Sequence, residues 1–505
     1  MKVILIQSPR RYWPFLSEGD NYILPQWMPC LAASLRNAGH EIKCIDCAAT
    51  HTGWKSLEDI IRKEEPDVVG VSEAHALYMD ESLKLVRLVK KIKMNITVVC
   101  GGGMFANIAE TLLKENPVDY IVKGEGEETF VELLEALEKE RPVESVDGVA
   151  YIRNGEYFQT PPRQLIGDMD TLPMPAYDLM PMDSYGRSKY LFSPGGITIH
   201  HSRGCPNNCR FCVWWMQMAD RKSNGTDEIL TPRWRTKSVR KTVDEIEFLF
   251  NEYGKKCFIF VDGSWNIDPE WNREFAREVM RRHLKINWFA FMRVDCILRD
   301  EKLGIMKELV ESGLSHICVG AEHSSDVIMG EFGKKIQDSD STKECMDIMR
   351  RMYPGVFVQA TFIVGTRAES KKTLEALAGY VRKLKVDYPA FHIFTPVPGT
   401  EMYKEAEKNG WLEIRDFRYY DWNTPIISTE NLARKDMEWE LYHLYKKSAG
   451  FFWLLKGLLS GSRYKRNMYI WWLIVALRLA LYTLKERIRP AEHFTRLIKP
   501  AWYDR

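Results

Sequence analysis

Three cysteines stand close together near the middle of the chain, in the segment Cys205-Pro-Asn-Asn-Cys209-Arg-Phe-Cys212. A loop with this spacing can place three thiolates around one inorganic group. Iron–sulfur clusters are normally held by four cysteine thiolates. No fourth cysteine lies nearby, so one iron of a [4Fe–4S] cluster would stay open for a chelating ligand. The spacing therefore predicts a cluster with Cys205, Cys209 and Cys212 as its metal ligands.

Two other interpretations of these cysteines stay open, a zinc site and a chance group of core cysteines. Zinc would need a fourth ligand, and the upstream candidates His200 and His201 do not have the offset of a usual zinc motif. Structural cysteines rarely recur at such short spacing. The remaining cysteines are isolated or, at Cys44 and Cys47, straddle the end of an apolar run, so we interpret them as structural thiols.

The cysteine loop follows the first strand of a series in which strands and helices alternate. The predicted strands lie near Ile197–His200, Cys257–Val261, Trp288–Phe291, His316–Val319, Val356–Val364 and Phe391–Thr395. Alternation of this kind indicates parallel βα units. These are fewer than the eight units of a closed barrel, so we expect a partial (β/α)6 barrel with its active end at the carboxyl edge of the strands.

The first 144 residues show the same alternation on a smaller scale. The apolar runs are Val3–Ile6, Glu41–Asp46, Val68–Ser72, Thr97–Cys100 and Tyr120–Val122. They predict an α/β, doubly wound, Rossmann-like sheet, which binds ligands at the carboxyl ends of its strands. The candidate contacts there are Ser8, Ser72, Glu73, Gly101, Gly102, Gly103, Gly124, Glu125, Gly126 and Glu127. Consecutive glycines allow a bulky ligand to approach the backbone closely, and the lack of Gly-x-Gly-x-x-Gly after the first strand argues against a dinucleotide.

The composition is that of an ordinary globular chain. It has 505 residues, 45% of them hydrophobic and 28% charged, which excludes a disordered chain and a disulfide-rich mini-protein. We divide it into a first domain (1–144), a proline-rich linker (145–195), the partial barrel (196–425) and a helical C-terminal region (426–505). The sparse cysteines and the lack of a signal-peptide pattern at the N-terminus predict a cytoplasmic protein with reduced thiols.

The C-terminal region is basic and aromatic. From residue 441 onward, 13 Lys and Arg stand against 3 Asp and Glu. The two most apolar stretches are Phe451–Lys456 and Met468–Tyr482; the second is shorter than the ~20 residues of a membrane span and contains Arg478. Basic residues flank it at Arg463, Lys465, Arg466, Lys485, Arg487 and Arg489. Two alternatives remain, a helix lying in a membrane interface and a helix packed on the barrel, whereas nucleic acid is disfavoured because no recognition motif is present.

Residues 197–400 resemble the radical S-adenosylmethionine superfamily. Besides the cysteine spacing, with Phe211 before the last cysteine, three segments carry the resemblance: Val319–Ser325, Phe362–Glu369 and Phe394–Thr400. The resemblance implies that S-adenosylmethionine chelates the open iron. It also implies cofactor contacts from Phe211, Asp262, Arg293, Glu322 and Ile363, although Asp262-Gly263-Ser264 departs from the family's Gly-Gly-Glu. The alternative for Arg293 and Glu322 is a structural ion pair in the barrel mouth.

The first domain resembles the cobalamin-binding domain that precedes many of these barrels, through its Gly-Gly and Gly-Glu-Gly-Glu segments. The Asp-x-His-x-x-Gly motif that supplies an axial imidazole in the other cobalamin fold is absent. The resemblance therefore implies cobalamin without a histidine in place of its own base, and with Trp27 or Met28 near the lower face. The alternative is a degenerate domain that serves as scaffold.

Together the resemblances imply a cobalamin-dependent C-methyltransferase, which methylates an unactivated carbon through a 5′-deoxyadenosyl radical and methylcobalamin. One alternative is an oxidative cyclase or rearrangement enzyme of the anaerobic magnesium-protoporphyrin monomethyl ester cyclase type. Another is a non-catalytic cobalamin or redox sensor. The expected partners are a reductant such as ferredoxin or flavodoxin, and a tetrapyrrole, an isoprenoid lipid or a peptide residue as substrate.

Overall fold

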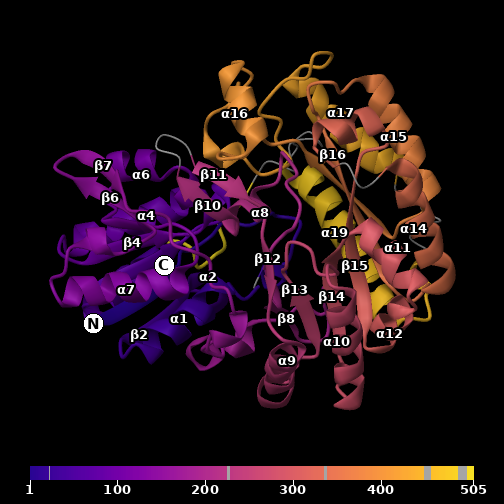
Figure 1. Ribbon diagram of the computed structural model, residues 1–505. Coiled ribbons are helices and arrows are strands. Elements are labelled where there is room, and N and C mark those ends of the chain that lie inside the picture. The colour runs from indigo at the N-terminus through magenta and orange to yellow at the C-terminus, as the bar shows by residue number, and fades with distance from the viewer. Residues whose placement is uncertain (22, 224–227, 335–337, 449–456, 487–496) are drawn as a thin grey trace.

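A computed structural model describes residues 1–21, 23–223, 228–334, 338–448, 457–486 and 497–505. The molecule has two lobes side by side, an N-terminal α/β lobe and a larger barrel lobe (Figure 1). Each lobe is built around one large sheet, of seven strands in the first and six in the second. The predicted fold class is therefore confirmed.

The N-terminal sheet has the strand order β2-β1-β3-β4-β5-β6-β7. Its parallel strands are β1 (Lys2–Gln7), β2 (Glu41–Asp46), β3 (Val68–Ser72), β4 (Thr97–Gly101) and β5 (Tyr120–Val122). Its helices are α1 (Trp27–Asn37), α2 (Cys47–Thr50), α3 (Trp54–Glu64), α4 (Met79–Ile92), α5 (Gly103–Asn107), α6 (Ala109–Glu115) and α7 (Gly126–Glu138). Helices α1 and α7 pack on one face, and α3 and α4 on the other. Because both faces are covered, the central strands need continuous apolar runs, which explains why all five strands were predicted.

The sheet continues past the predicted domain boundary at residue 144. The antiparallel hairpin of β6 (Val149–Arg153) and β7 (Glu156–Gln159) extends it beside β5. Its two-residue turn is Asn154-Gly155, with φ of 51° and 83°, the conformation that an Asn-Gly hairpin turn favours. The start of the predicted linker is therefore part of the first sheet, and the Asn-Gly pair was the signal for it. From residue 160 to 195 the chain crosses between the lobes through short 3-10 turns.

The barrel lobe contains the six predicted parallel strands in the order β17-β16-β15-β14-β13-β8. They are β8 (Gly196–Ile199), β13 (Cys257–Phe260), β14 (Asn287–Met292), β15 (Leu314–Glu322), β16 (Phe357–Val364) and β17 (Tyr388–Ile393). The helices between and after them are α9 (Val239–Tyr253), α10 (Pro269–Arg281), α11 (Val294–Lys302), α12 (Ile305–Glu311), α13 (Asp326–Glu331), α14 (Ser339–Met352), α15 (Lys371–Leu384) and α16 (Glu401–Lys408). The sheet does not close, which confirms the partial barrel.

Smaller elements surround the cysteine loop, between β8 and α9. Strand β9 (Ser202–Gly204) pairs with β12 (Trp234–Thr236), and β10 (Asp220–Ser223) pairs with β11 (Glu228–Thr231). The loop itself connects β9 to the short helix α8 (Val213–Gln217). These elements lie where the two lobes meet (Figure 1).

The C-terminal region forms α17 (Arg434–Ser448) and α19 (Arg463–Glu486). The first half of α19 packs on the barrel: Tyr464 contacts His316, and the Trp472 ring lies 3.8 Å from that of Tyr388. Lys465 forms an ion pair with Asp387 at 2.7 Å, so its charge already has a partner. Among the described helices none is both long and apolar enough to cross a bilayer. The predicted residues Phe451–Lys456, Arg487 and Arg489 lie outside the described residues.

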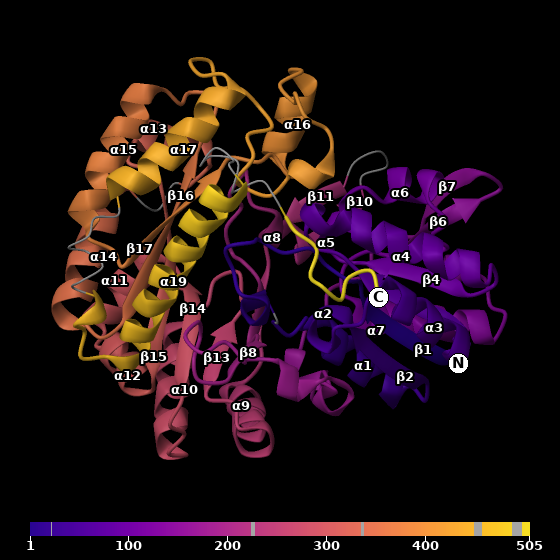
Figure 2. The ribbon, with the colours of Figure 1, turned by 180° about the vertical axis from the view of Figure 1, so that it is seen from behind.

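The end of the chain returns to the N-terminal lobe (Figure 2). Tyr12 and Ile498 form an antiparallel bridge. The Trp54 amide donates to the Tyr503 carbonyl at 3.0 Å, and two further amides of α3 donate to the Arg505 carbonyl. The last residues therefore belong structurally to the first lobe.

Candidate cofactor site

A cavity of about 330 Å³ lies between the two lobes. On the side of the N-terminal lobe it is lined by the predicted contacts Trp27, Ser72, Gly101, Gly102, Gly103, Gly124, Glu125, Gly126 and Glu127. On the barrel side it is lined by His200, the strand Ser202–Gly204, Trp214 and Gly263. The carboxyl ends of both sheets thus face one shared space.

Six glycines expose backbone in the wall of the cavity on the N-terminal side, among apolar and polar side chains. Gly102 has φ of 89°, and a Cβ added there would lie 2.6 Å from the Glu73 carbonyl oxygen. Gly124 has φ of 94°, with open space where its side chain would be. A large flat ligand can rest on such a surface. The residues present therefore fit cobalamin, as the resemblance implied.

Three predicted contacts do not line the cavity. Met28 is fully buried in the core, because successive residues of a helix point about 100° apart; Trp27 faces the cavity and donates its Nε1–H to Gln7 at 3.2 Å. Ser8 is buried. Glu73 is buried too, where it forms an ion pair with Arg10 at 2.7 Å and accepts a bond from Ser82. Of these two neighbours, Trp27 lines the cavity and Met28 does not, so contact of Trp27 with cobalamin stays a prediction.

Glu125 and Glu127 connect the lobes through buried ion pairs. Arg203 of β9 donates to Glu125 at 2.7 Å and to Glu127 at 2.5 Å, and Arg235 of β12 donates to Glu125 at 2.8 Å. Burial opposes ionisation of Glu127, but the Arg203 guanidinium outweighs it and lowers the pKa of that carboxyl. No pattern in the sequence indicated Arg235, and the only signal for Arg203 was its place two residues before Cys205. We call these four side chains the interlobe ion network.

The three cysteines lie in a loop that is fixed at its centre. The Cys209 carbonyl accepts bonds from the Cys212 amide at 3.1 Å and from the Trp215 indole at 3.0 Å. Phe211 packs edge-on against Phe332, with ring centroids 5.1 Å apart, so its described contact anchors the loop. All three thiols are free and partly exposed. The loop is thus held in place while its thiols stay accessible.

Burial favours the protonated form of the Cys209 and Cys212 thiols until a metal displaces the proton. Burial raises the pKa of Cys209, and that of Cys212 to about 12; ligation requires the thiolate. Within the described part of the chain, no three His, Cys, Asp or Glu side chains converge closely enough for a single metal ion. The thiolates of a cubane bind different irons, so the three cysteines need not converge in that way.

The remaining predicted contacts lie at the carboxyl edge of the barrel, as expected. Asp262 follows β13, and its Oδ1 accepts bonds from the amides of His201 at 3.1 Å and Ser202 at 2.5 Å. Its Oδ2 is buried and has no hydrogen-bond partner among the described residues. One oxygen therefore fixes the strand that leads into the cysteine loop, and because the side chain is fully buried, contact of Asp262 with S-adenosylmethionine stays a prediction.

The alternative prediction for Arg293 and Glu322 was a structural ion pair; the two do not pair with each other, but each forms an ion pair with another residue. Arg293 pairs with Asp295 through two contacts of 3.0 Å, and Glu322 pairs with Lys334 at 2.7 Å. Glu322 has a left-handed φ of 54°, a strained backbone conformation that is often found at functional sites. Ile363, on the neighbouring strand β16, is partly exposed. The roles of these residues toward S-adenosylmethionine stay predictions.

Each of the two lobes matches a known protein family. Residues 14–134 match the B12 binding domain, and residues 199–381 match the radical SAM superfamily. The chain therefore belongs to the cobalamin-dependent radical S-adenosylmethionine enzymes. Its cofactors are cobalamin, a [4Fe–4S] cluster and S-adenosylmethionine.

Individual relatives cover most of the chain. An uncharacterized methyltransferase of Pyrococcus horikoshii is 30% identical over 442 residues, which are 87% of this chain and 90% of the relative. An anaerobic magnesium-protoporphyrin IX monomethyl ester cyclase of Cereibacter sphaeroides is 28% identical over 82% of this chain but only 65% of the cyclase. The structure of the radical S-adenosylmethionine methyltransferase TsrM of Kitasatospora setae, with cobalamin and a [4Fe–4S] cluster bound, superposes with a TM-score of 0.69 at 16% identity, over 95% of this chain and 99% of TsrM. The last comparison shows a shared fold.

Proposed function

We propose that this enzyme methylates an unactivated carbon of its substrate. The observation that carries the proposal is the shared cavity, because its walls are the glycine loops of one lobe and the strand leading into the cysteine loop of the other. When bound, the cluster and S-adenosylmethionine supply hydrogen abstraction, and cobalamin supplies the methyl group. A substrate bound between these cofactors would lose a hydrogen atom to one and accept the methyl group from the other.

Residues of this chain would hold each group in place. Cys205, Cys209 and Cys212 would ligate the cluster, and Asp262, Arg293, Glu322 and Ile363 would contact S-adenosylmethionine at the barrel mouth. The glycine loops and Trp27 would hold cobalamin. The cluster needs an external electron donor, for which ferredoxin or flavodoxin are the candidates.

Methyl transfer is favoured over cyclisation by the relatives. The chain spans 90% of a relative named as a methyltransferase but 65% of the cyclase. The names of relatives do not identify the methyl acceptor. A tetrapyrrole, an isoprenoid lipid and a peptide residue all stay candidates.

The test uses S-adenosylmethionine with a trideuterated methyl group. The reconstituted enzyme, a reductant and an extract of cells lacking the enzyme are incubated anaerobically and analysed by mass spectrometry. We expect a compound carrying the trideuteromethyl group, together with 5′-deoxyadenosine and S-adenosylhomocysteine, and none of these with the Cys209→Ala variant. 5′-Deoxyadenosine without S-adenosylhomocysteine would contradict methyl transfer and favour cyclisation. Formation of neither compound would favour a sensor.

A further inference from the structure

Two adjacent histidines at the end of β8 point to different places. The His201 imidazole Nδ1 lies 2.8 Å from Asp262, and its ring packs against Trp271 at 4.1 Å, so it belongs to the core. His200 lines the cavity between the lobes and is 8% exposed. Its Nε2 is buried and has no hydrogen-bond partner among the described residues. A buried polar atom without a partner is rare in folded proteins, and because His200 also lines the cavity, a group bound there is able to supply the missing partner.

The imidazole of His200 is neutral. Burial lowers its pKa well below the usual value, and the nearby cations Lys237 and Arg203 lower it further. A neutral imidazole offers one hydrogen-bond donor and one acceptor. It therefore suits a group that can both donate and accept.

The charged side chains around His200 already have partners. Lys237 is paired with Glu245 at 2.8 Å, and Arg203 and Arg235 are paired within the interlobe ion network. Burial also raises the pKa of the Cys30 thiol, which lines the same cavity, to about 12, so the thiol is uncharged. This end of the cavity is thus polar but electrically balanced. Such an environment favours an uncharged amide over a carboxylate or a phosphate, either of which would need an unpaired cation.

Cobalamin carries uncharged carboxamide side chains around its corrin ring. We propose that His200 hydrogen-bonds one of these carboxamides from the barrel side of the cavity, so that cobalamin is held by both lobes. His200 would then be a positioning residue, and the two lobes would be fixed relative to each other through the cofactor. The proposal rests on cobalamin binding in this cavity and not on the reaction that follows.

The test measures the dissociation constant of hydroxocobalamin for the full-length, cluster-loaded protein. His200→Phe keeps a ring of similar shape without polar atoms, and we expect it to weaken binding about tenfold, with unchanged iron content. His200→Gln restores a donor and an acceptor, and we expect it to bind within about threefold of the wild type. Loss of one well-formed hydrogen bond with its partner left buried is of this size. If His200→Phe does not fold, His200→Ala takes its place with the same expected loss.

The matched control is His316→Phe. His316 is also buried with an Nε2 that has no described partner, but its Nδ1 contacts Tyr464 and it does not line the cavity. This control should bind hydroxocobalamin like the wild type. Wild-type affinity of His200→Phe would overturn the proposal, as would an equal loss in His200→Gln. A nitrogen splitting in the electron paramagnetic resonance of bound cob(II)alamin that disappears in His200→Phe would also overturn it, because the imidazole would then ligate cobalt.

Discussion

At the scale of single residues, the site depends on backbone conformations that few side chains tolerate. Gly102 combines a left-handed φ of 89° with a tight contact to the Glu73 backbone. Gly155 has a similar φ of 83° but open space around it, in the distant β6–β7 turn. A substitution at Gly155 therefore introduces backbone strain alone, whereas a substitution at Gly102 introduces the same strain and also changes the wall of the cavity.

We expect Gly102→Ala to destabilise the protein by about 1–3 kcal/mol, because the new Cβ meets backbone in a strained conformation. It should also lose cobalamin during gel filtration while keeping its iron. Gly155→Ala should lower stability by about 1–2 kcal/mol and retain cobalamin. Urea unfolding and the cobalamin absorbance after gel filtration measure both effects. Full cobalamin retention by Gly102→Ala would show that the glycine loop does not hold the cofactor.

Local sequence patterns indicate some residues of the site and not others. Glycine-rich strand ends and a cysteine loop are local patterns, so the sequence could indicate Gly101–Gly103, which line the cavity, and the three cysteines, whose role as cluster ligands stays a prediction. Which residue of α1 faces the cavity depends on how the helix sits on the sheet, so Trp27 and Met28 could not be separated. The partners of Arg203 and Glu322 come from segments far away along the chain. No local pattern reports such contacts.

At the scale of elements, the interlobe ion network joins β9 and β12 to Glu125, just before α7, and to Glu127 in the first turn of α7. Breaking a buried ion pair leaves an uncompensated charge and costs about 3–5 kcal/mol. We expect Arg203→Met to lower the free energy of unfolding by that amount. Arg277→Met should change it by less than about 1 kcal/mol, because Arg277 is 64% exposed in its pair with Glu308.

Acid should weaken this network. Since the folded-state pKa of Glu127 lies below its ordinary value of 4.5, its contribution is complete above that value and is lost as the pH falls through the folded-state pKa. The difference in stability between wild type and Arg203→Met should therefore shrink on acidification below about pH 4.5. A difference that stays constant across this range would place the stabilisation elsewhere.

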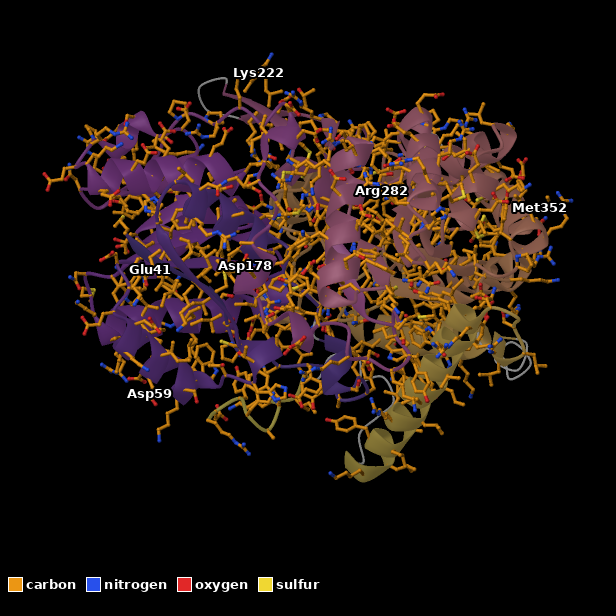
Figure 3. All side chains as sticks on the ribbon, turned by 90° about the horizontal axis from the view of Figure 1, so that it is seen from below. Glu41, Asp59, Asp178, Lys222, Arg282 and Met352 are labelled. Carbon is orange, nitrogen blue, oxygen red and sulfur yellow. The ribbon has the colours of Figure 1, made fainter. Side chains whose placement is uncertain are left out.

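The element α19 has two different halves. Its first half packs on β15 and β16, whereas Leu477, Leu481 and Leu484 in its second half are 55%, 65% and 76% exposed. Figure 3 shows the far end of this helix extending away from the barrel. Exposed leucines four and three residues apart lie on one side of a helix. Association with a membrane surface stays a prediction, and the exposed leucines in the second half of α19 are the surface that we expect to make the contact.

We expect the full chain to sediment with anionic liposomes at low salt and to be released as salt screens the basic residues. Replacing Leu477, Leu481 and Leu484 together by Gln should abolish sedimentation. Leu459→Gln is the control, because Leu459 is 85% exposed but lies before the helix. If the wild type stays in the supernatant at low salt, the prediction is wrong.

At the scale of the whole molecule, the strands of both sheets were predicted because buried parallel strands appear as continuous apolar runs. The contact between the lobes was not predicted. The chain crosses from one lobe to the other through residues 160–195 and crosses back at its C-terminus, where Trp54 binds the Tyr503 carbonyl. The lobes are joined at both crossings and by the interlobe ion network, of which Arg203, Glu125 and Glu127 line the cavity between them.

The central claim is that cobalamin binds in the cavity and that the cluster binds at the cysteine loop beside it, close enough for both to act on the same substrate. Electron paramagnetic resonance of the anaerobically reconstituted enzyme, with both the cluster and cobalamin in their paramagnetic states, tests it most directly. We predict that each signal is broadened or split by the other, and that the cobalamin signal of Cys209→Ala shows no such interaction. A spectrum equal to the sum of the two signals, each recorded with one cofactor alone, would contradict the account.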